Sequence, residues 1–383
     1  MNEIERLETY LITKEVKGAC ADSTRKVDKI GFLIVKAITK EGHEGIGITY
    51  NEIGGDATKQ LIDISIAPRV IGKDPFCTED IWNDLFQYLR GVGRKGLSFC
   101  AISAVDIALW DLKGKITGLP LNRMFGSTVR SRIPVYASGG WTSYSDDELL
   151  EEIGAFVKDG YTRVKFKVGA EGGIGRDLER LKKVREAFGP GLEIMLDANN
   201  CWDAATAIRF ADRAKEYDIA FLEEPVFADD VEGLRRFREA SVVPLATGEH
   251  EYTRFGARDL LLRGAVDVLQ MDTARAGGFT EMLKIAALTQ AWNIKFAPHC
   301  MEYLNLHLLS AFSNSLYAER LYIFNDLWGG HLGQVVGAEG EVLGLFRDLV
   351  GGESSARNLD HGAHLVLQIH ARSEEHTSEL QSR

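Results

Sequence analysis

The stretch RVKFKVG, Arg163–Gly169, is a short β-like run with two lysines two positions apart. Because side chains alternate along a strand, Lys165 and Lys167 point to the same face. Two adjacent ammonium groups repel each other, and an ordinary core strand has no use for them. One interpretation is a solvated edge strand, on which lysines prevent unwanted pairing. The sequence on either side favours a different interpretation.

The chain around this stretch repeats one pattern from Ile133 onward, in which short apolar strands alternate with amphipathic helices. The strands we predict are IPVYAS, RVKFKV, LEIMLDAN, IAFLEEP, VPLATGEH, VDVLQMD, IKFAPH and LYAER. Strand–helix alternation predicts a parallel sheet, and eight such units predict a closed (β/α)8 barrel, or TIM barrel. We therefore predict an α/β fold with a catalytic barrel over residues 128–325.

The segment before the barrel has a different pattern. Strands are predicted up to Tyr50, and three helices follow, over Asp56–Ile71, Thr78–Arg90 and Ser98–Gly118. The third helix ends on a glycine shortly before a proline, which is a strong stop signal. Residues 1–127 are therefore predicted to form an α+β capping domain.

Two segments follow the predicted barrel. Residues 326–371 are rich in glycine and end in a strand-like run, HLVLQIH, so we predict that they pack back on the capping domain. Residues 372–383, RSEEHTSELQSR, are polar and aperiodic, and they resemble the conceptual translation of a sequencing-adapter oligonucleotide. We exclude them from the fold and predict that they are disordered.

Composition restricts the class of protein. The 383 residues are 45% hydrophobic and 26% charged, with a net charge of −11, and no basic stripe suggests a nucleic-acid partner. The acidic N-terminus lacks the apolar core of a signal peptide, and no apolar run is long enough to span a membrane. The five scattered cysteines form no CxxC pair, which predicts free thiols and a cytoplasmic location.

Polar residues occur at the carboxyl ends of successive predicted strands, where a barrel places its active site. Any one of these carboxylates alone would be explained as a helix cap. A series of them, each separated from the next by about one strand–helix unit, would not arise from independent caps. The residues in this series are Lys165, Lys167, Asp197, Glu223, Glu249, Asp272, His299 and Glu319.

Three carboxylates in the series, Asp197, Glu223 and Glu249, come from neighbouring strands with no basic residue among them. Unneutralised, they would repel one another in a partly buried mouth. Oxygen ligands with open positions suit Mg²⁺ better than Zn²⁺, so we predict one Mg²⁺ per site, with Mn²⁺ able to substitute. Such an ion holds a substrate carboxylate and stabilises an enediolate.

The remaining polar residues suggest acid–base chemistry. Removing a proton α to a carboxylate requires a tuned base, and Lys165 is expected to lower the pKa of its neighbour Lys167, the candidate base. Asp272 would orient His299 as a second acid or base on the opposite face of the substrate. Lys165 and Glu319 would contact the substrate carboxylate.

The motifs KFK, DANN, LEEP, TGEH, MDTARAGG and APH, with the earlier helix SAVDIALWDLKGK, together resemble the enolase superfamily and its mandelate racemase-like subgroup. The resemblance covers nearly the whole chain and implies the same two-domain fold and the Mg²⁺-dependent chemistry of that superfamily. By this resemblance, the positions that match metal ligands are Asp197, Glu223 and Glu249. Those that match catalytic groups are Lys167, Asp272, His299 and Glu319, and Asn199 matches a residue that bonds the substrate's α-hydroxyl.

The family contains racemases, epimerases, dehydratases and cycloisomerases, so the fold alone does not determine the reaction. Cycloisomerase-type members place a lysine on the sixth strand, where this chain has MDTARAGG without one. The two bases fit both 1,1-proton transfer and dehydration. We predict dehydration of an acid sugar to a 2-keto-3-deoxy acid. A racemase or epimerase of a 2-hydroxy acid is the alternative, and a non-catalytic barrel is the third interpretation.

Substrate specificity is expected to come from two loops of the capping domain, EVKGACADSTRKVDK (15–29) and YNEIGGDA (50–57). Both are polar and contain glycine, which favours a polyhydroxylated acid over an apolar substrate. The candidate substrate-binding residues are Arg25, Lys26, Tyr50 and Asn51, although each also fits a solvated surface loop. We predict a small-molecule substrate, no nucleic-acid or membrane partner, and a homo-oligomer.

Overall fold

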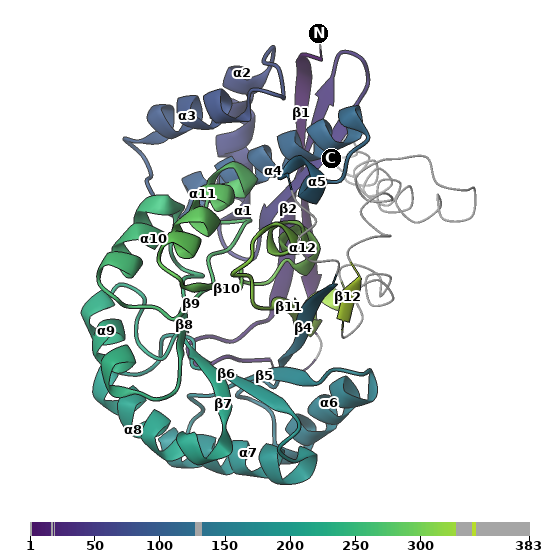
Figure 1. The fold of residues 1–383 in the computed structure, drawn as a ribbon. Coiled ribbons are helices and arrows are strands. Elements are labelled where there is room, and N and C mark those ends of the chain that lie inside the picture. Colours follow the sequence, from purple (N-terminus) through teal and green to yellow (C-terminus); the bar gives the residue numbers. More distant parts are fainter. Residues whose placement is uncertain (1, 17, 19, 127–131, 327–338, 342–383) are drawn as a thin grey trace.

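The structure is a computed structural model that describes residues 2–16, 18, 20–126, 132–326 and 339–341. Its first part is a three-stranded antiparallel sheet of β1 (Ile4–Glu15), β2 (Lys29–Thr39) and β3 (Glu44–Tyr50), in that order. The central strand is apolar along most of its length and is buried on both faces. Figure 1 shows this sheet and its helices on one side of a larger curled sheet.

The helices of the first part follow the sequence prediction, with one irregularity. They are α1 (Gly55–Gln60), α2 (Ala67–Val70), α3 (Thr78–Leu89) and α4 (Leu97–Thr117). A π-helical turn, Leu61–Ile66, separates α1 from α2. Pro68 lies two residues after the end of this turn, and because proline has no N–H to donate, it favours a break in the regular helical ladder there. α4 ends on Gly118 in the left-handed conformation, as its stop signal predicted.

Two glycines of β3 allow that strand to lie directly against α4. A Cβ on Gly47 would lie 1.8 Å from the carbonyl oxygen of Ala104, and a Cβ on Gly45 would lie 2.2 Å from that of Ala108. The contact is therefore between backbones, and it leaves no room for even a methyl group. This approach fixes the position of the cap helix on the cap sheet.

Gly47→Ala is expected to lower the free energy of unfolding by about 3 kcal/mol, because the added methyl group must push β3 away from α4. Urea unfolding monitored by circular dichroism measures this loss. Gly91→Ala is the control, since a Cβ there meets nothing within 4 Å, and it should change stability by less than about 0.5 kcal/mol. Equal stability of the two variants would contradict the backbone contact.

The second part is a curled parallel sheet surrounded by helices, which confirms the predicted barrel with a capping domain. Its helices are α5 (Leu121–Met124), α6 (Asp146–Lys158), α7 (Gly173–Phe188), α8 (Ala204–Ala214), α9 (Val231–Ala240), α10 (Thr253–Leu262), α11 (Gly278–Ala291) and α12 (Glu302–Ala311). Its strands are β4 (Arg132–Gly139), β5 (Arg163–Lys167), β6 (Glu193–Asp197), β7 (Ile219–Glu223), β8 (Leu245–Thr247), β9 (Val268–Leu269), β10 (Lys295–Phe296) and β11 (Ala318–Leu321).

These strands follow the order β10-β9-β8-β7-β6-β5-β4-β11. A parallel bridge between Phe296 of β10 and Ser315 joins the strand at one end of this path to the segment before β11, at its other end. Two backbone hydrogen bonds support it, from Leu316 N to Phe296 O and from Phe296 N to Asn314 O. The sheet thus returns on itself, and the eight strand motifs predicted from the sequence all occur in it.

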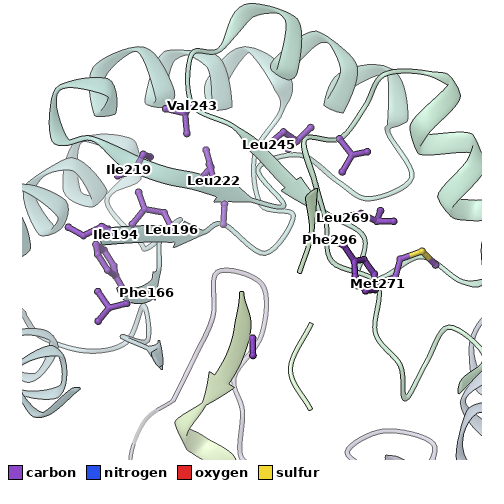
Figure 2. Packing of buried hydrophobic residues seen from close by; sticks show 14 of the residues in the cluster. Phe166, Ile194, Leu196, Ile219, Leu222, Val243, Leu245, Leu269, Met271 and Phe296 are labelled. Carbon is purple, nitrogen blue, oxygen red and sulfur yellow. The ribbon is translucent and has the colours of Figure 1, made fainter. Parts of the chain in front are cut away.

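Alternation along the strands separates an outer core from an inner one. Residues such as Ile194, Leu196, Leu222 and Leu245 lie between the strands and the surrounding helices, as Figure 2 shows. The intervening positions face the barrel interior, where an inner cluster contains Tyr136, Met195, Phe221, Ala246, Val268 and Ala297. Because Met195 faces inward, so does Asp197, two residues later.

Cap helix α4 is joined to the barrel at the start of α11. Asp106 accepts a hydrogen bond from the backbone N–H of Thr280 (2.9 Å), and Ser103 Oγ accepts one from Gly277 N (2.8 Å). Gly278 has a φ of 74°, and a Cβ there would lie 2.4 Å from Asp106 Oδ2. The two glycines of MDTARAGG thus let a carboxylate of the cap interact with the positive end of a barrel helix.

Several predictions concern residues outside the described ranges. The segment 326–371 is described only at β12 (Glu339–Glu341), which pairs antiparallel with β4 of the barrel. Its packing against the capping domain and the disorder of residues 372–383 therefore remain predictions, as do the domain boundaries. Among the helices in the described ranges, none has the length and low charge that crossing a bilayer requires. The five cysteines are free thiols.

Candidate active site

Strand register brings the predicted polar residues together. Lys167 is paired with Asp197 across β5 and β6, and Asp197 with Glu223 across β6 and β7. Glu249 follows the end of β8 by two residues. One carboxylate oxygen from each of Asp197, Glu223 and Glu249 lies within 4.8 Å of the others, and all three residues are buried. We refer to these three residues as the carboxylate triad.

The two lysines of RVKFKVG contact the carboxylate triad. Lys165 Nζ lies 2.7 Å from Glu223 Oε2 and 2.6 Å from Glu319 Oε1. Lys167 Nζ lies 2.5 Å from Asp197 Oδ2. Both lysines are buried, and β5 is hydrogen-bonded between β4 and β6. The interpretation of a solvated edge strand is therefore wrong, because β5 has no free edge.

Burial and close charges shift several pKa values here. Burial lowers the pKa of Lys165, but Glu223 and Glu319 outweigh it and raise that pKa well above its usual value. Burial and Lys165 lower the pKa of Lys167, but Asp197, Glu249 and Glu223 together outweigh them, so the net shift of that pKa is upward. This is opposite to the direction expected from the two lysines alone, because the sequence pattern does not show that Asp197 contacts Lys167.

The triad carries more negative charge than the lysines neutralise. Burial, with the neighbouring carboxylate of Asp197, raises the pKa of Glu223 well above its usual value despite Lys165. Glu223 Oε1 is buried and has no hydrogen-bond partner among the described residues. A buried carboxylate oxygen without a donor is costly. The three carboxylates, one of which has an oxygen without a hydrogen-bond partner, thus form a ligand set that fits a hard divalent cation such as Mg²⁺.

Asp272 and His299 form a hydrogen-bonded pair beside the triad. His299 Nδ1 lies 2.7 Å from Asp272 Oδ2, and His299 Nε2 lies 3.2 Å from Glu249 Oε2. Burial opposes the imidazolium, but contacts with Cys300, Glu249 and Asp272 raise the pKa of His299 well above its usual value. The carboxylate therefore favours the charged imidazole, and the ring's other nitrogen is directed toward the triad.

Glu319, from β11, completes the ring of polar groups. Its Oε2 accepts a hydrogen bond from the backbone N–H of Cys300 (3.0 Å), while its Oε1 contacts Lys165. Burial raises the pKa of Glu319, but Lys165 and His299 outweigh it and lower that pKa to about 2. Glu319 is thus a carboxylate in this arrangement.

Asn199 lies at the same mouth, directly after β6. Its backbone N–H donates to Asp197 Oδ1 (2.9 Å), and its backbone has a φ of 41°. The side-chain oxygen Oδ1 is buried and has no hydrogen-bond partner among the described residues. A free amide oxygen at this position is available to a substrate hydroxyl, as the resemblance implied.

The loop 15–29 reaches the barrel mouth, but not through the residues chosen from the sequence. Ser23 Oγ donates to the carbonyl oxygen of Ala198 (2.6 Å), at the end of β6. Arg25 is paired with Glu52 (3.3 Å), and Lys26 is paired with Asp28 (2.7 Å), both within the cap. Asn51 donates to Thr13 Oγ1 at 2.9 Å. The substrate-binding roles of Arg25, Lys26 and Asn51 therefore remain predictions.

Tyr50, the remaining residue chosen from these loops, contacts the Asp272–His299 pair. Its hydroxyl donates to Asp272 Oδ2 (2.6 Å), the same oxygen that faces His299 Nδ1. The guanidinium of Arg275 lies over its ring, 4.4 Å from the centroid. The cap therefore supplies one of the groups that orient Asp272.

Tyr50→Phe distinguishes a substrate-binding role from this orienting role. If the hydroxyl serves Asp272, the variant should lose about tenfold in kcat with KM changed less than twofold, because only a hydrogen bond to a charged group is removed. Steady-state kinetics measure the two constants. A rise in KM with unchanged kcat would instead assign Tyr50 to the substrate. Tyr88→Phe, an exposed tyrosine of α3, is the control.

Sequence reasoning missed several buried groups of this site. Gln270 Nε2 donates to Glu223 Oε2 (2.8 Å), and Cys300 Sγ lies 3.1 Å from His299 Nε2. Glu224 is also buried; it accepts from Asn200 Nδ2 (2.5 Å) and lies 2.8 Å from His250 Nδ1. The positions of these residues near the strand ends were visible in the sequence, but the contacts of Gln270 and Glu224 are made with residues that follow or belong to other strands.

Comparison with known proteins agrees with this geometry. Residues 148–342 match the family model described as "Enolase C-terminal domain-like", and residues 8–126 match "Mandelate racemase / muconate lactonizing enzyme, N-terminal domain". The barrel, cap and polar mouth define a two-domain protein of the enolase superfamily. The chain belongs to its mandelate racemase / muconate lactonizing enzyme family.

Relatives in this family carry out different reactions. The L-talarate/galactarate dehydratase of Salmonella typhimurium is 33% identical over 80% of this chain and 77% of its own. The D-galactarolactone cycloisomerase of Agrobacterium fabrum is 32% identical, over 78% of each chain. A racemase structure from Streptomyces coelicolor with bound magnesium has a TM-score of 0.81 and 32% identity, covering 83% of this chain and 89% of that one.

Proposed function

We propose that this protein removes the proton α to the carboxylate of an acid sugar and eliminates the β-hydroxyl as water, giving a 2-keto-3-deoxy acid. In atom balance, the α C–H and the β C–O bonds break, one water leaves, and the resulting enol tautomerises to the ketone. The dehydratase relative, whose name specifies two acid sugars, supports this substrate class.

One observation carries the proposal: a candidate base contacts each end of the carboxylate triad. Lys167 contacts Asp197, and His299 contacts Glu249. A substrate carboxylate held at the triad would therefore have its α-carbon within reach of a lysine from one direction and an imidazole from the other. We assign proton removal to one of these groups and protonation of the departing hydroxyl to the other.

The other residues bind and orient the substrate. The triad would hold one Mg²⁺, which when bound engages the substrate carboxylate and stabilises the negative charge that develops there. Lys165 donates to the same carboxylate, and Glu319 holds Lys165 in place through their 2.6 Å contact. Asn199 Oδ1, which has no hydrogen-bond partner among the described residues, accepts a hydrogen bond from the substrate's α-hydroxyl. These residue roles and the replacement of Mg²⁺ by Mn²⁺ are proposals.

A racemase or epimerase acting on 2-hydroxy acids is the second candidate, because the same pair of bases fits proton transfer between two faces. A substrate without a β-hydroxyl leaves only reprotonation as an outcome. A non-catalytic barrel is less consistent with the site, since all eight polar positions of the series are filled and six of their contacts join them directly. The cytoplasmic location and the homo-oligomer remain predictions.

A screen of mono- and diacid sugars with Mg²⁺ tests the proposal. Formation of a 2-keto acid, detected by semicarbazide absorbance and NMR, is the expected result, and a chelator should abolish it. A change of configuration without keto acid across the whole panel would replace the dehydratase by the racemase. Because one relative is a cycloisomerase, the panel should include galactarolactone, and ring isomerisation alone would refute dehydration. Absence of α-proton exchange in D₂O with every acid would support the non-catalytic interpretation.

A further inference from the structure

Asn305, in the first turns of α12, is a polar residue that the chemistry above does not use. It is fully buried, and its amide is bonded on both sides. Nδ2 donates to the carbonyl oxygens of His299 (3.1 Å) and Cys300 (2.7 Å). Oδ1 accepts from Thr273 Oγ1 at 2.5 Å. A buried amide with this many bonds orders the groups around it.

The groups that Asn305 joins are the two loops that carry Asp272 and His299. Thr273 is the residue directly after Asp272, and the two carbonyl groups belong to His299 and to the residue after it. Among the described residues, the last backbone hydrogen bond between these two segments runs from Ala297 N to Leu269 O (3.0 Å), because β9 and β10 pair over only two residues each. Asn305 therefore replaces a missing part of the ladder between them.

The loop that carries His299 is also strained. Cys300 has a φ of 44° and Met301 a φ of 42°, so two successive residues other than glycine have left-handed backbones. Such a backbone is strained for any residue other than glycine and persists only when its surroundings hold it. The bonds from Asn305 Nδ2 to the carbonyl oxygens of His299 and Cys300 hold this turn.

We propose that Asn305 is a positioning residue that keeps His299 aligned with Asp272, so that His299 Nε2 faces the triad. The inference rests on the proposed function for the role of the pair in catalysis, but not for the alignment itself. Asn305 acts through the backbone carbonyls of His299 and Cys300 and through Thr273, and it bonds neither the His299 ring nor the Lys167 ammonium group. Small misplacements of a reacting group are costly in rate, because proximity and orientation supply a large part of catalysis.

Four variants separate the halves of this network. Asn305→Asp keeps an oxygen that accepts from Thr273 but loses the two hydrogen bonds that Nδ2 donates to the turn. Asn305→Ala loses all three hydrogen bonds. Thr273→Val removes only the hydroxyl, and Thr273→Ser restores it. Asn314→Ala is the matched control, since Asn314 Nδ2 also bonds a threonine hydroxyl (2.8 Å) and a backbone carbonyl (2.9 Å), at the opposite end of β10.

The first readout needs no substrate: NMR of the full chain labelled with ¹⁵N at its nine histidines, with the His299 signals identified by their loss in His299→Asn. In Asn305→Ala and Asn305→Asp, the Nδ1 signal should move toward that of a histidine without a carboxylate partner. In Asn314→Ala and Thr273→Ser it should stay unchanged. An unchanged Nδ1 signal in a folded Asn305→Asp would overturn the proposal.

The second readout is kinetic, on galactarate and L-talarate, which differ in configuration at one α-carbon. Exchange that depends on His299 should fall at least tenfold in Asn305→Ala, and exchange that depends on Lys167 should fall less than threefold. An equal fall in both would mean general destabilisation and would refute positioning. If Asn305→Ala does not fold, NMR of Thr273→Val and Thr273→Ser tests the proposal instead. A displaced His299 signal in Thr273→Val but not in Thr273→Ser supports positioning, and an unchanged signal in both contradicts it. A displaced His299 signal without any exchange in the wild-type protein would refute the proposed function and leave the positioning role intact.

Discussion

Glu223→Gln is expected to reduce Mg²⁺ affinity about 100-fold and turnover about 1000-fold, the scale on which metal-site and transition-state contacts act. Glutamine keeps the shape of the side chain but removes one of three charges in the triad. Lys165 then keeps Glu319 as its near anionic partner, and the open oxygen that fits a cation becomes part of an amide. Calorimetric titration of Mg²⁺ into chelator-treated protein measures affinity, and keto-acid formation measures turnover.

Glu232→Gln is the control for this experiment, because Glu232 is an exposed carboxylate of α9 that pairs with Arg235. It makes the same chemical change away from the triad and should leave affinity and turnover within about twofold of the parent. Full Mg²⁺ affinity in Glu223→Gln would show that the triad is not the metal site. Normal affinity with lost turnover would instead assign Glu223 a role in orienting Lys165.

Lys167→Ala and His299→Asn are expected to have opposite stereochemical effects. Each variant should lose about 1000-fold in α-proton exchange for one member of the galactarate and L-talarate pair, a value within the range of general acid–base catalysis. Exchange with the other member of the pair should stay within about tenfold of the parent protein. The reason is that Lys167 and His299 contact opposite ends of the triad, and in the proposed mechanism they therefore approach the α-carbon from different sides. Deuterium incorporation followed by NMR measures both exchanges.

Controls for this pair come from exposed residues of the same type. Lys182→Ala, on α7, and His43→Asn, in the turn between β2 and β3, should leave both exchanges unchanged. If both active-site variants lost exchange with both epimers equally, the two residues would act in one relay, and the assignment of one base to each face would be wrong. Retained exchange in both variants would require a different base.

Local patterns in the sequence predicted the elements that place the site. Period-two alternation in RVKFKVG predicted that Lys165 and Lys167 point to the same face, and in β5 both are buried beside Asp197 of β6. The recurrence of a polar residue after each apolar strand predicted that residues from distant parts of the sequence meet at one mouth. This reasoning succeeds because the side-chain direction in a strand depends on residue number alone, and because parallel strands place like ends together.

The sequence did not predict the contacts that surround these residues. The upward pKa shift of Lys167 depends on carboxylates of other strands, and Arg25 and Lys26 pair with Glu52 and Asp28 of the two cap loops. Because the cap loops are polar, the sequence analysis treated Arg25 and Lys26 as free to bind a substrate. Their side chains are long and flexible, so which acid each one meets depends on the folded loop and not on any periodic pattern.

The sequence by itself determined the barrel, its capping domain and the set of polar residues at the strand ends. Only the tertiary structure decided that Tyr50 of the cap donates to Asp272, that Asp106 binds the start of α11, and that Asn305 joins the loops of Asp272 and His299. Strand and helix periodicity arises from neighbours along the chain, and so it can be read from residue order. The other contacts join residues that are brought together by the docking of the cap on the barrel and of α12 on the strand ends, and the close approach of Gly278 to the Asp106 side chain is part of the contact between cap and barrel.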